Sequence, residues 1–313
     1  MPKYITIKGQ QIPKGETVLT KLNVARLPSG TIIDIPVHVF RAKEDGPVLL
    51  VMGGMHGDEV NGIEIIRRMT KRKQLQPERG TVIAIPILNV YGFLNFSRDV
   101  PDGKDVNRSF PGNQNGSLAS RVAFAFMKEV LPNVDFGIDF HTGGSSRSNF
   151  PHVRSLLDTE QNLKLAKAFG APFVLNAAYR PGSFRKEAAK RGKSILVYEA
   201  GESLRFDEEG IKEGMNGTLR VMQHLGMIAN APAATEPVIL MRNTWVRAKR
   251  AGLFRTGIKL GERVKKNQLL GSITDPYGEF EVKLKSPADG FVIGLNHMPV
   301  IHQGDALLHI GQA

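Results

Sequence analysis

Apolar runs alternate with amphipathic segments from residue 48 to residue 225. Val48–Met52 is a continuous apolar run followed by two glycines, which predicts a fully buried strand with a sharp exit. Asn61–Thr70 then repeats apolar residues at helical spacing. The same patterns predict strands at Thr81–Pro86, Val134–Phe140, Pro172–Leu175 and Ser194–Tyr198, and helices at Ala119–Leu131, Leu156–Phe169, Phe184–Arg191 and Phe206–Leu225.

This alternation predicts an α/β fold, with a mostly parallel or mixed sheet and helices on both faces. The preceding segment is predicted to be β-structure: Tyr4–Lys8, then a hairpin of Val18–Ala25 and Ile32–Phe40 with a turn at Pro28-Ser29-Gly30. The segment Asn89–Pro111 is long and rich in Asn, Asp, Gly and Pro. Loops of that length inside a compact domain are usually functional.

The pattern changes after a linker at residues 229–237. Helical periodicity is lost, and short β segments are separated by glycine turns, so residues 238–313 are predicted to form a small all-β, barrel-like domain. Residues 1–228 then form the first domain, with the N-terminal hairpin region at 1–46. Leu260–Leu270 is echoed by Ile301–Ile310, which suggests two halves of similar shape.

Composition narrows the class of protein. The chain has 313 residues, a formal charge of +12 and no cysteine, so disulfides, thiolate ligands and a cysteine nucleophile are excluded. The amino terminus lacks the apolar core of a secretory signal, and no apolar run reaches membrane-spanning length, so we expect a cytoplasmic protein. The basic residues are scattered and no nucleic-acid motif accompanies them, so we expect no nucleic-acid or membrane partner.

Histidines and acids follow three of the predicted strands. His56 and Glu59 follow the first, His141 ends the third, and Glu199 ends the last. Because neighbouring parallel strands end at one edge of a sheet, we expect these side chains to converge. Two imidazoles and a carboxylate form a three-ligand zinc site with a position left for water. Glu199 is then placed to act as base and proton carrier.

The long loop supplies cationic and amide side chains. Arg98 lies in its middle, and Asn107-Arg108 follow within the segment Asp105–Gly112. One arginine can stabilise the oxyanion of a tetrahedral intermediate. Another can hold a substrate carboxylate bidentately, with the asparagine amide assisting.

These motifs, in this order, resemble the succinylglutamate desuccinylase/aspartoacylase family, a branch of the zinc-carboxypeptidase-like fold. The resemblance covers roughly residues 30 to 225. The matching segments are His56-x-x-Glu59, Asp105-x-Asn107-Arg108, Asp139-Phe140-His141-Thr142 and Glu199-Ala200-Gly201-Glu202.

The resemblance implies a role for each site residue. His56, Glu59 and His141 would bind one zinc ion per chain. Arg98 would polarise the scissile carbonyl, and Glu199 would be the general base and then the acid. Asn107 and Arg108 would hold the substrate carboxylate, with Arg185 as a second substrate arginine. Tyr179 and Tyr277 are candidates for a tyrosine near the site.

The C-terminal segment resembles the biotinyl/lipoyl-carrier hairpin fold through Gly261–Leu270 and Ser286–Val292. A carrier presents a lysine at the tip between these motifs. The corresponding segment here, Thr274–Phe280, has none. We therefore expect an unmodified relative of the carriers that covers the active site or mediates assembly.

Together these observations predict a zinc-dependent hydrolase that cleaves the amide bond of a small, anionic N-acyl amino acid. The alternatives are a zinc carboxypeptidase or deglutamylase acting on peptides, and a non-catalytic binding module. The sequence leaves open the acyl group, the amino acid and the oligomeric state.

Overall fold

A computed structural model describes residues 4–26 and 29–313. Within that part of the chain, a 13-stranded sheet follows the path β12-β19-β17-β8-β10-β7-β5-β6-β4-β3, with β9, β11 and β14 paired off it. Its strands are β3 (Thr17–Arg26), β4 (Ile32–Arg41), β5 (Glu44–Met52), β6 (Arg79–Ile85), β7 (Phe136–Gly143), β8 (Arg147–Ser155), β9 (Phe173–Asn176), β10 (Ser194–Glu202), β11 (Val238–Leu240), β12 (Arg242–Arg247), β14 (Arg263–Val264), β17 (Gly290–Asn296) and β19 (Ala306–Gln312).

The centre of this sheet is parallel and its flanks are antiparallel. β5 pairs in parallel with β6 and β7, and β7 pairs in parallel with β10. β4 and β8 add antiparallel strands on either side. The predicted mixed α/β sheet is confirmed, and its centre consists of continuous apolar runs because both faces are covered.

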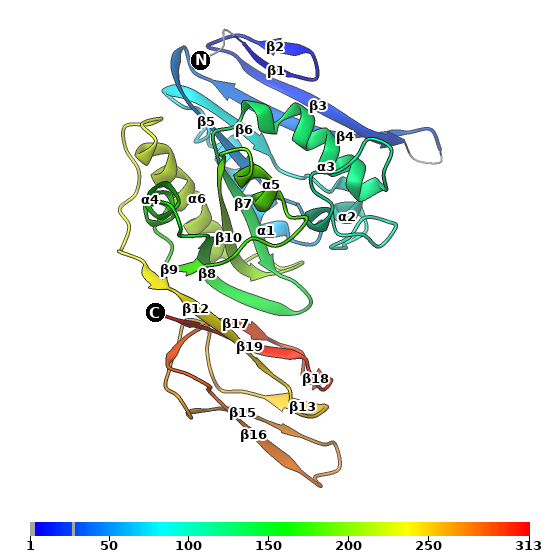
Figure 1. The fold of residues 1–313 in the computed structure, drawn as a ribbon, viewed down its shortest axis with the longest axis vertical. Helices are drawn as coiled ribbons and strands as arrows, with labels where there is room; N and C mark the ends of the chain where they lie inside the picture. Colours follow the sequence, from blue (N-terminus) through cyan, green and yellow to red (C-terminus); the bar gives the residue numbers. More distant parts are fainter. Residues whose placement is uncertain (1–3, 27–28) are drawn as a thin grey trace.

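Helices cover both faces of the sheet (Figure 1). Successive side chains of β5 point to opposite faces: Leu50 and Met52 pack with α3 and α5, whereas Leu49 and Val51 pack with α1, α4 and α6. The helices are α1 (Val60–Lys71), α2 (Val90–Leu94), α3 (Leu118–Glu129), α4 (Glu160–Phe169), α5 (Phe184–Ala189) and α6 (Glu208–His224).

The N-terminal hairpin forms as predicted, with β3 and β4 antiparallel from Thr17↔Phe40 to Arg26↔Ile32. A two-stranded sheet of β1 (Ile5–Ile7) and β2 (Gln10–Ile12) precedes it. Pro28 of the predicted turn, and Met1 to Lys3 of the amino terminus, lie outside the described residues. No helix of the described chain is long and apolar enough to cross a membrane; the cytoplasmic location stays a prediction.

β8 was not predicted. Its nine residues include Pro151 and several polar side chains, so they lack the apolar run of a central strand. Its place comes from long-range pairing with β10 on one side and β17 on the other. The helix predicted from residue 156 consequently begins only at α4, where Thr159 accepts a hydrogen bond from the Asn162 backbone N–H.

The C-terminal region is all-β, as predicted, and lies at one end of the molecule (Figure 1). β12, β17 and β19 extend the large sheet, and a four-stranded sheet has the order β16-β15-β13-β18. The region has a hydrophobic core of its own, which includes Val246, Phe254 and Leu308. The strands of the small sheet are β13 (Gly252–Arg255), β15 (Leu269–Thr274), β16 (Glu281–Lys285) and β18 (Val300–Ile301).

Residues 229–237 contain no helix or strand. The C-terminal region is nevertheless tied to the rest, because β17 pairs with β8 through Gly294↔Asn149 and Asn296↔Arg147. The division into domains at 1–228 and 238–313 stays a prediction, supported by the separate core.

Candidate metal centre and pocket

Three strand ends converge at the carboxyl edge of the parallel strands. His141 lies on β7 and Glu199 on β10, where the two residues are register partners. His56 and Glu59 follow β5 in the loop that leads into α1. Gly57 allows this loop to pack closely, because a Cβ there would lie 1.9 Å from the backbone carbon of Gly92.

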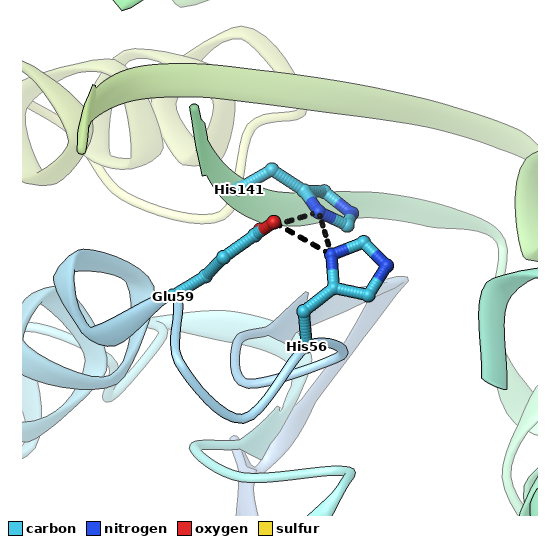
Figure 2. Close-up of side chains that lie close together, drawn as sticks. All are labelled: His56, Glu59 and His141. Carbon is cyan, nitrogen blue, oxygen red and sulfur yellow. Dashed lines mark hydrogen bonds and ion pairs between the residues drawn. The ribbon is translucent and has the colours of Figure 1, made fainter. Parts of the chain in front are cut away.

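The side chains of His56, Glu59 and His141 form one buried cluster (Figure 2). Glu59 Oε1 lies 2.7 Å from His56 Nδ1, and its Oε2 lies 2.8 Å from His141 Nδ1. The two Nδ1 atoms are 3.2 Å apart. One potential ligand atom from each residue therefore falls within 4.8 Å of the others, close enough for a single ion.

An aspartate carboxylate lies beside the far nitrogen of each of the two histidine rings. Asp105 Oδ1 lies 3.4 Å from His56 Nε2, and Asp139 Oδ2 lies 3.0 Å from His141 Nε2. A carboxylate close to one ring nitrogen favours the proton on that nitrogen and leaves the other as a potential ligand. Sequence reasoning assigned no role to either aspartate. The spacing Asp139-x-His141 was a signal, because residues two apart on a strand share a face.

The electrostatics of the cluster suit a cation. Burial would raise the pKa of Glu59, yet the charges of His56 and His141 hold that pKa far below its usual range. Burial likewise opposes protonation of His141, but Asp139 and Glu59 raise the pKa of its imidazole well above the ordinary value. The surrounding carboxylates thus stabilise positive charge at this point, whether carried by protons or by a metal ion.

Glu199 lies outside the cluster of His56, Glu59 and His141 and has its own partners. Arg154 Nη1 lies 3.1 Å from its Oε1, and Asn149 Nδ2 donates to its Oε2 over 2.8 Å. Both partners are on β8, and the sequence pattern predicted neither that strand nor these two contacts. They fix the carboxylate of Glu199 at the pocket wall.

Arg98 contacts the cluster of His56, Glu59 and His141 directly. Its Nη1 lies 3.1 Å from His56 Nδ1 and 3.3 Å from Glu59 Oε1, and its Nη2 pairs with Asp105 at 2.9 Å. Burial lowers the pKa of Arg98, but Glu59 and Asp105 outweigh it and raise that pKa. A permanent cation is therefore held beside the cluster of His56, Glu59 and His141.

Asn107 and Arg108 lie on a short 3₁₀ turn, Val106–Arg108. Asn107 Oδ1 accepts from the Phe184 backbone N–H over 3.0 Å, which ties the long loop to the start of α5. Because the side-chain oxygen of Asn107 accepts this bond, its amide nitrogen is the group that can donate to a ligand. Arg108 donates to the Asn107 carbonyl over 2.6 Å and lies 4.0 Å from Asp105.

Arg185 is buried, although it belongs to a short helix. Its Nη2 donates to the carbonyls of Ala177 and Ala178, and its guanidinium lies 5.1 Å from the ring centre of Tyr179. Its buried Nη1 has no partner among the described residues. Burial, assisted by the positive charge of Arg154, lowers the pKa of Arg185 to about 10. An arginine without a carboxylate partner can bind an anion.

All eight site residues expected from the sequence line one pocket of about 160 Å³. Arg154, Arg180 and Asp139 line it too. Burial and the neighbouring charges of Arg154 and Arg108 lower the pKa of Arg180. Of the two candidate tyrosines, Tyr179 contacts Arg185, whereas Tyr277 is 85% exposed at the tip between β15 and β16.

Residues 45–225 match the model of the succinylglutamate desuccinylase/aspartoacylase catalytic domain. The chain is 29% identical over 300 residues to N-alpha-acetyl-L-2,4-diaminobutyric acid deacetylase of Halomonas elongata, covering 89% of this chain and 85% of the relative.

Two solved structures share the fold over nearly the whole chain. A succinylglutamate desuccinylase/aspartoacylase from Rhodobacter sphaeroides has 28% identity and a TM-score of 0.84, with 95% of each chain covered. The product-bound ectoine utilization protein EutE (DoeB) from Ruegeria pomeroyi has 25% identity and a TM-score of 0.86, with 100% of each chain covered.

Proposed function

The chain belongs to the succinylglutamate desuccinylase/aspartoacylase family, and from this premise we propose that it is a zinc-dependent hydrolase of small N-acyl amino acids. It cleaves the amide bond and releases a carboxylic acid and a free amino acid. The deacetylase activity in the name of the Halomonas elongata relative supports the reaction class.

The observation that carries the proposal is the cluster of His56, Glu59 and His141. Its three ligand atoms converge, it is buried, and it lines a pocket together with Glu199. Two nitrogens and one carboxylate are a frequent ligand set of catalytic zinc. The aspartates at both Nε2 atoms leave the Nδ1 atoms as ligands, so the residues present fit the ion.

When bound, zinc supplies a Lewis acid that polarises the acyl carbonyl and makes a water molecule acidic enough to attack near neutral pH. Glu199 accepts the proton of the attacking water and then donates it to the nitrogen of the leaving amine. Arg154 and Asn149 position its carboxylate for both transfers. Arg98, beside the ligand cluster, stabilises the negative charge that develops on the carbonyl oxygen.

Arg108, Asn107 and Arg185 bind the carboxylate of the amino acid. Asn107 contributes its amide nitrogen, and Arg185 contributes the unpartnered Nη1. The charge balance of the pocket also selects among amino acids. Each acidic residue of the pocket already has a partner: Glu59 and Asp139 contact histidines, and Glu199 contacts Arg154. No acid of the described pocket is left to bind a side-chain ammonium.

We therefore propose that the substrate has a neutral or acidic amino acid, unlike the diaminobutyric acid in the name of the relative. The test is a panel of N-acetyl amino acids assayed with zinc-loaded protein by release of free amine. N-acetyl-L-aspartate or N-acetyl-L-glutamate should exceed N-α-acetyl-L-2,4-diaminobutyrate in kcat/KM by about tenfold, which corresponds to one modest charge interaction. The reverse order would contradict this choice.

Two further measurements complete the test: analysis of the metal content, and assays of hydrolysis with short peptides. About one zinc per chain is expected in the active protein, and metal analysis that finds none after reconstitution would remove the zinc assignment. Hydrolysis of peptides but of no N-acyl amino acid would favour the carboxypeptidase alternative.

A further inference from the structure

A line of register partners crosses the large sheet from the strand of Glu199 to the C-terminal region. It runs over β10, β8, β17, β19 and β12, which carry the sheet from one part of the molecule into the other (Figure 1). Residues directly opposite each other on neighbouring strands share one face of a sheet. We call this line the cross-sheet row. Its members, each opposite the next, are Gly201, Asn149, Gly294, His309 and Trp245.

The cross-sheet row lies on the face of the sheet that carries Glu199. Asn149 and Trp245 line one cavity together with Glu199. The pairing of β10 with β8 is irregular between Glu199 and Gly201, and there Asn149 Nδ2 donates to Glu199 Oε2 over 2.8 Å. The row therefore acts directly on the carboxylate to which we assign proton transfer.

The amide of Asn149 has a defined orientation. An ionised carboxylate only accepts hydrogen bonds, so the amide presents its nitrogen to Glu199. Its oxygen faces β17 and lies 3.2 Å from the point where a Cβ of Gly294 would stand. Half a turn of the amide would place that oxygen against the carboxylate and break the bond. The space above Gly294 therefore decides how firmly the amide is held.

Glycine at position 294 leaves a gap the size of a methyl group, and Trp245 closes this gap from the other side. The same Cβ point lies 3.5 Å from Trp245 Cη2, at the far edge of the indole, and 3.0 Å from His309 Cβ. Glycine inside a strand often marks such a close approach. The amide of Asn149 and the indole of Trp245 thus meet across Gly294.

Trp245 is itself held by a neutral partner. Its ring stacks on His309, with centroids 4.3 Å apart and planes 7° from parallel. His309 Nε2 lies 2.9 Å from Asn243 Oδ1, and burial lowers the pKa of the His309 imidazole to about 3. The imidazole is therefore uncharged near neutral pH, and the stack keeps the indole plane fixed without adding charge beside it.

We propose that Trp245 is a positioning residue for proton transfer: its indole edge, across Gly294, holds the Asn149 amide in the orientation that fixes the Glu199 carboxylate. The C-terminal region thereby contributes to turnover without supplying a group that touches the reacting atoms. This inference rests on the proposed deacylase function, in which Glu199 is the general base.

Trp245→Phe tests the contact with little disturbance of the fold. Phenylalanine keeps a ring on His309 but lacks the far edge that reaches the gap at Gly294. In zinc-loaded protein with the best N-acetyl amino acid, kcat should fall about tenfold, because small misplacements near the chemistry cost up to roughly 100-fold. KM should stay nearly unchanged, since the general base acts in the transition state.

A double-mutant cycle separates positioning from an independent role. Asn149→Ala removes the hydrogen bond to Glu199 and should lower kcat roughly 10- to 100-fold. Trp245→Phe added to Asn149→Ala should lower kcat no further, because the amide through which Trp245 acts is gone. Losses that add, wild-type kcat in Trp245→Phe, or a rise in its KM would overturn the proposal.

Gly294→Ala disturbs the row from the opposite side. Its methyl group would stand 3.2 Å from Asn149 Oδ1 and should displace the amide, lowering kcat about tenfold. Gly257→Ala is the matched control, because a Cβ there meets no atom of the described residues within 4 Å. The control should keep the wild-type kcat. A wild-type kcat in Gly294→Ala would contradict the role of the gap and, with it, the proposal.

The fluorescence of Trp245 gives a readout that does not need turnover, because it is the one tryptophan of the 313-residue chain. Gly294→Ala and Asn149→Ala should each change its emission, since both alter what the indole edge meets. Gly257→Ala should leave the emission unchanged. Emission that is unchanged in both row variants would show that the ring does not contact the row, against the proposal.

The two proposals fail in different ways. Zinc-loaded protein that hydrolyses N-acyl amino acids but shows additive losses in the cycle contradicts the positioning role alone. Zinc-loaded protein that hydrolyses no N-acyl amino acid contradicts the proposed function and, with it, the role of Trp245 in proton transfer.

Discussion

Glu199 is distinguished from the other carboxylates of the pocket by its partners. Glu59 and Asp139 contact histidine rings, whereas Glu199 is held by Arg154 and Asn149 on the neighbouring strand. Its carboxylate is therefore separate from the cluster of His56, Glu59 and His141, in keeping with the proton-transfer role that we propose for it.

Glu199→Gln should keep zinc and lose hydrolysis. The amide cannot accept the proton of water, and loss of a general base typically costs 10² to 10⁴-fold in rate. Metal analysis and kcat measured on the same sample check the prediction. Wild-type turnover in the zinc-loaded variant would remove Glu199 from its role.

Arg108→Met should lower kcat/KM more for substrates that carry a free carboxylate than for their methyl esters. Losing a charge-assisted hydrogen bond costs about 1.5–3 kcal/mol, or roughly 10- to 100-fold in kcat/KM. The comparison uses one N-acyl amino acid and its ester. Equal losses on both compounds would contradict carboxylate recognition by Arg108.

Asp139→Asn should weaken zinc binding about 10- to 100-fold, because replacing a carboxylate that orients a histidine ligand has effects of this size. Competition with a chelator measures the affinity. Asp102→Asn, an exposed change in the long loop, is the control and should bind zinc like the wild type. An unchanged affinity in Asp139→Asn would limit Asp139 to a packing role.

The helices α1 and α6 are joined by an ion-pair network as well as by packing. Arg68 contacts Glu64 and, with two nitrogens, Glu208, each at 2.7 Å. Arg67 binds Glu64 as well. The pKa of Glu64 is lowered to about 2, first by Arg67 and then by Arg68, while burial opposes the shift.

A lowered carboxylate pKa stabilises the fold above the unfolded pKa and loses that effect as pH falls through the folded value. For Glu64 the window runs from 4.5 down to about 2. Glu64→Gln should therefore lower the free energy of unfolding by about 1 kcal/mol at pH 6, and the difference should shrink towards pH 2.

Urea unfolding of both proteins across this range measures the effect. Glu160→Gln removes an exposed pair with Lys164 and serves as a control with little expected change. A difference for Glu64→Gln that does not vary with pH would assign the effect to packing and not to ionisation.

At the level of the whole chain, the large sheet runs without interruption from the α/β part into the C-terminal region. A metal bound at the strand ends of this sheet binds the folded chain only, since its ligands come from residues 56 to 141. Such an ion stabilises the folded state by mass action.

Removal of zinc by a chelator should lower the melting temperature by roughly 5 °C, assuming free zinc near 1,000 times its dissociation constant in the loaded sample. Calorimetry with and without chelator tests this, and added zinc should restore the value. His141→Ala should melt at the same temperature in both conditions. A wild-type melting temperature insensitive to zinc would contradict a site that depends on the fold.

Local patterns in the sequence were sufficient to predict the central strands and helices of the fold. The apolar run before His56 and the spacing of the following helix predicted β5 and α1, and the order of strand ends predicted which histidines and acids meet. These features depend on the period of side chains along a strand or helix, and that period is visible within about ten residues.

Features that depend on pairing between distant segments could be seen only in the tertiary structure. β8 has a polar sequence and becomes a central strand only between β10 and β17, so Arg154 and Asn149 could not be placed beside Glu199 in advance. The burial of Arg185 has the same origin. The sequence by itself determined the fold class and which histidines and acids converge, whereas only the folded chain decided which arginines lack a carboxylate partner, because that depends on contacts between residues far apart in sequence.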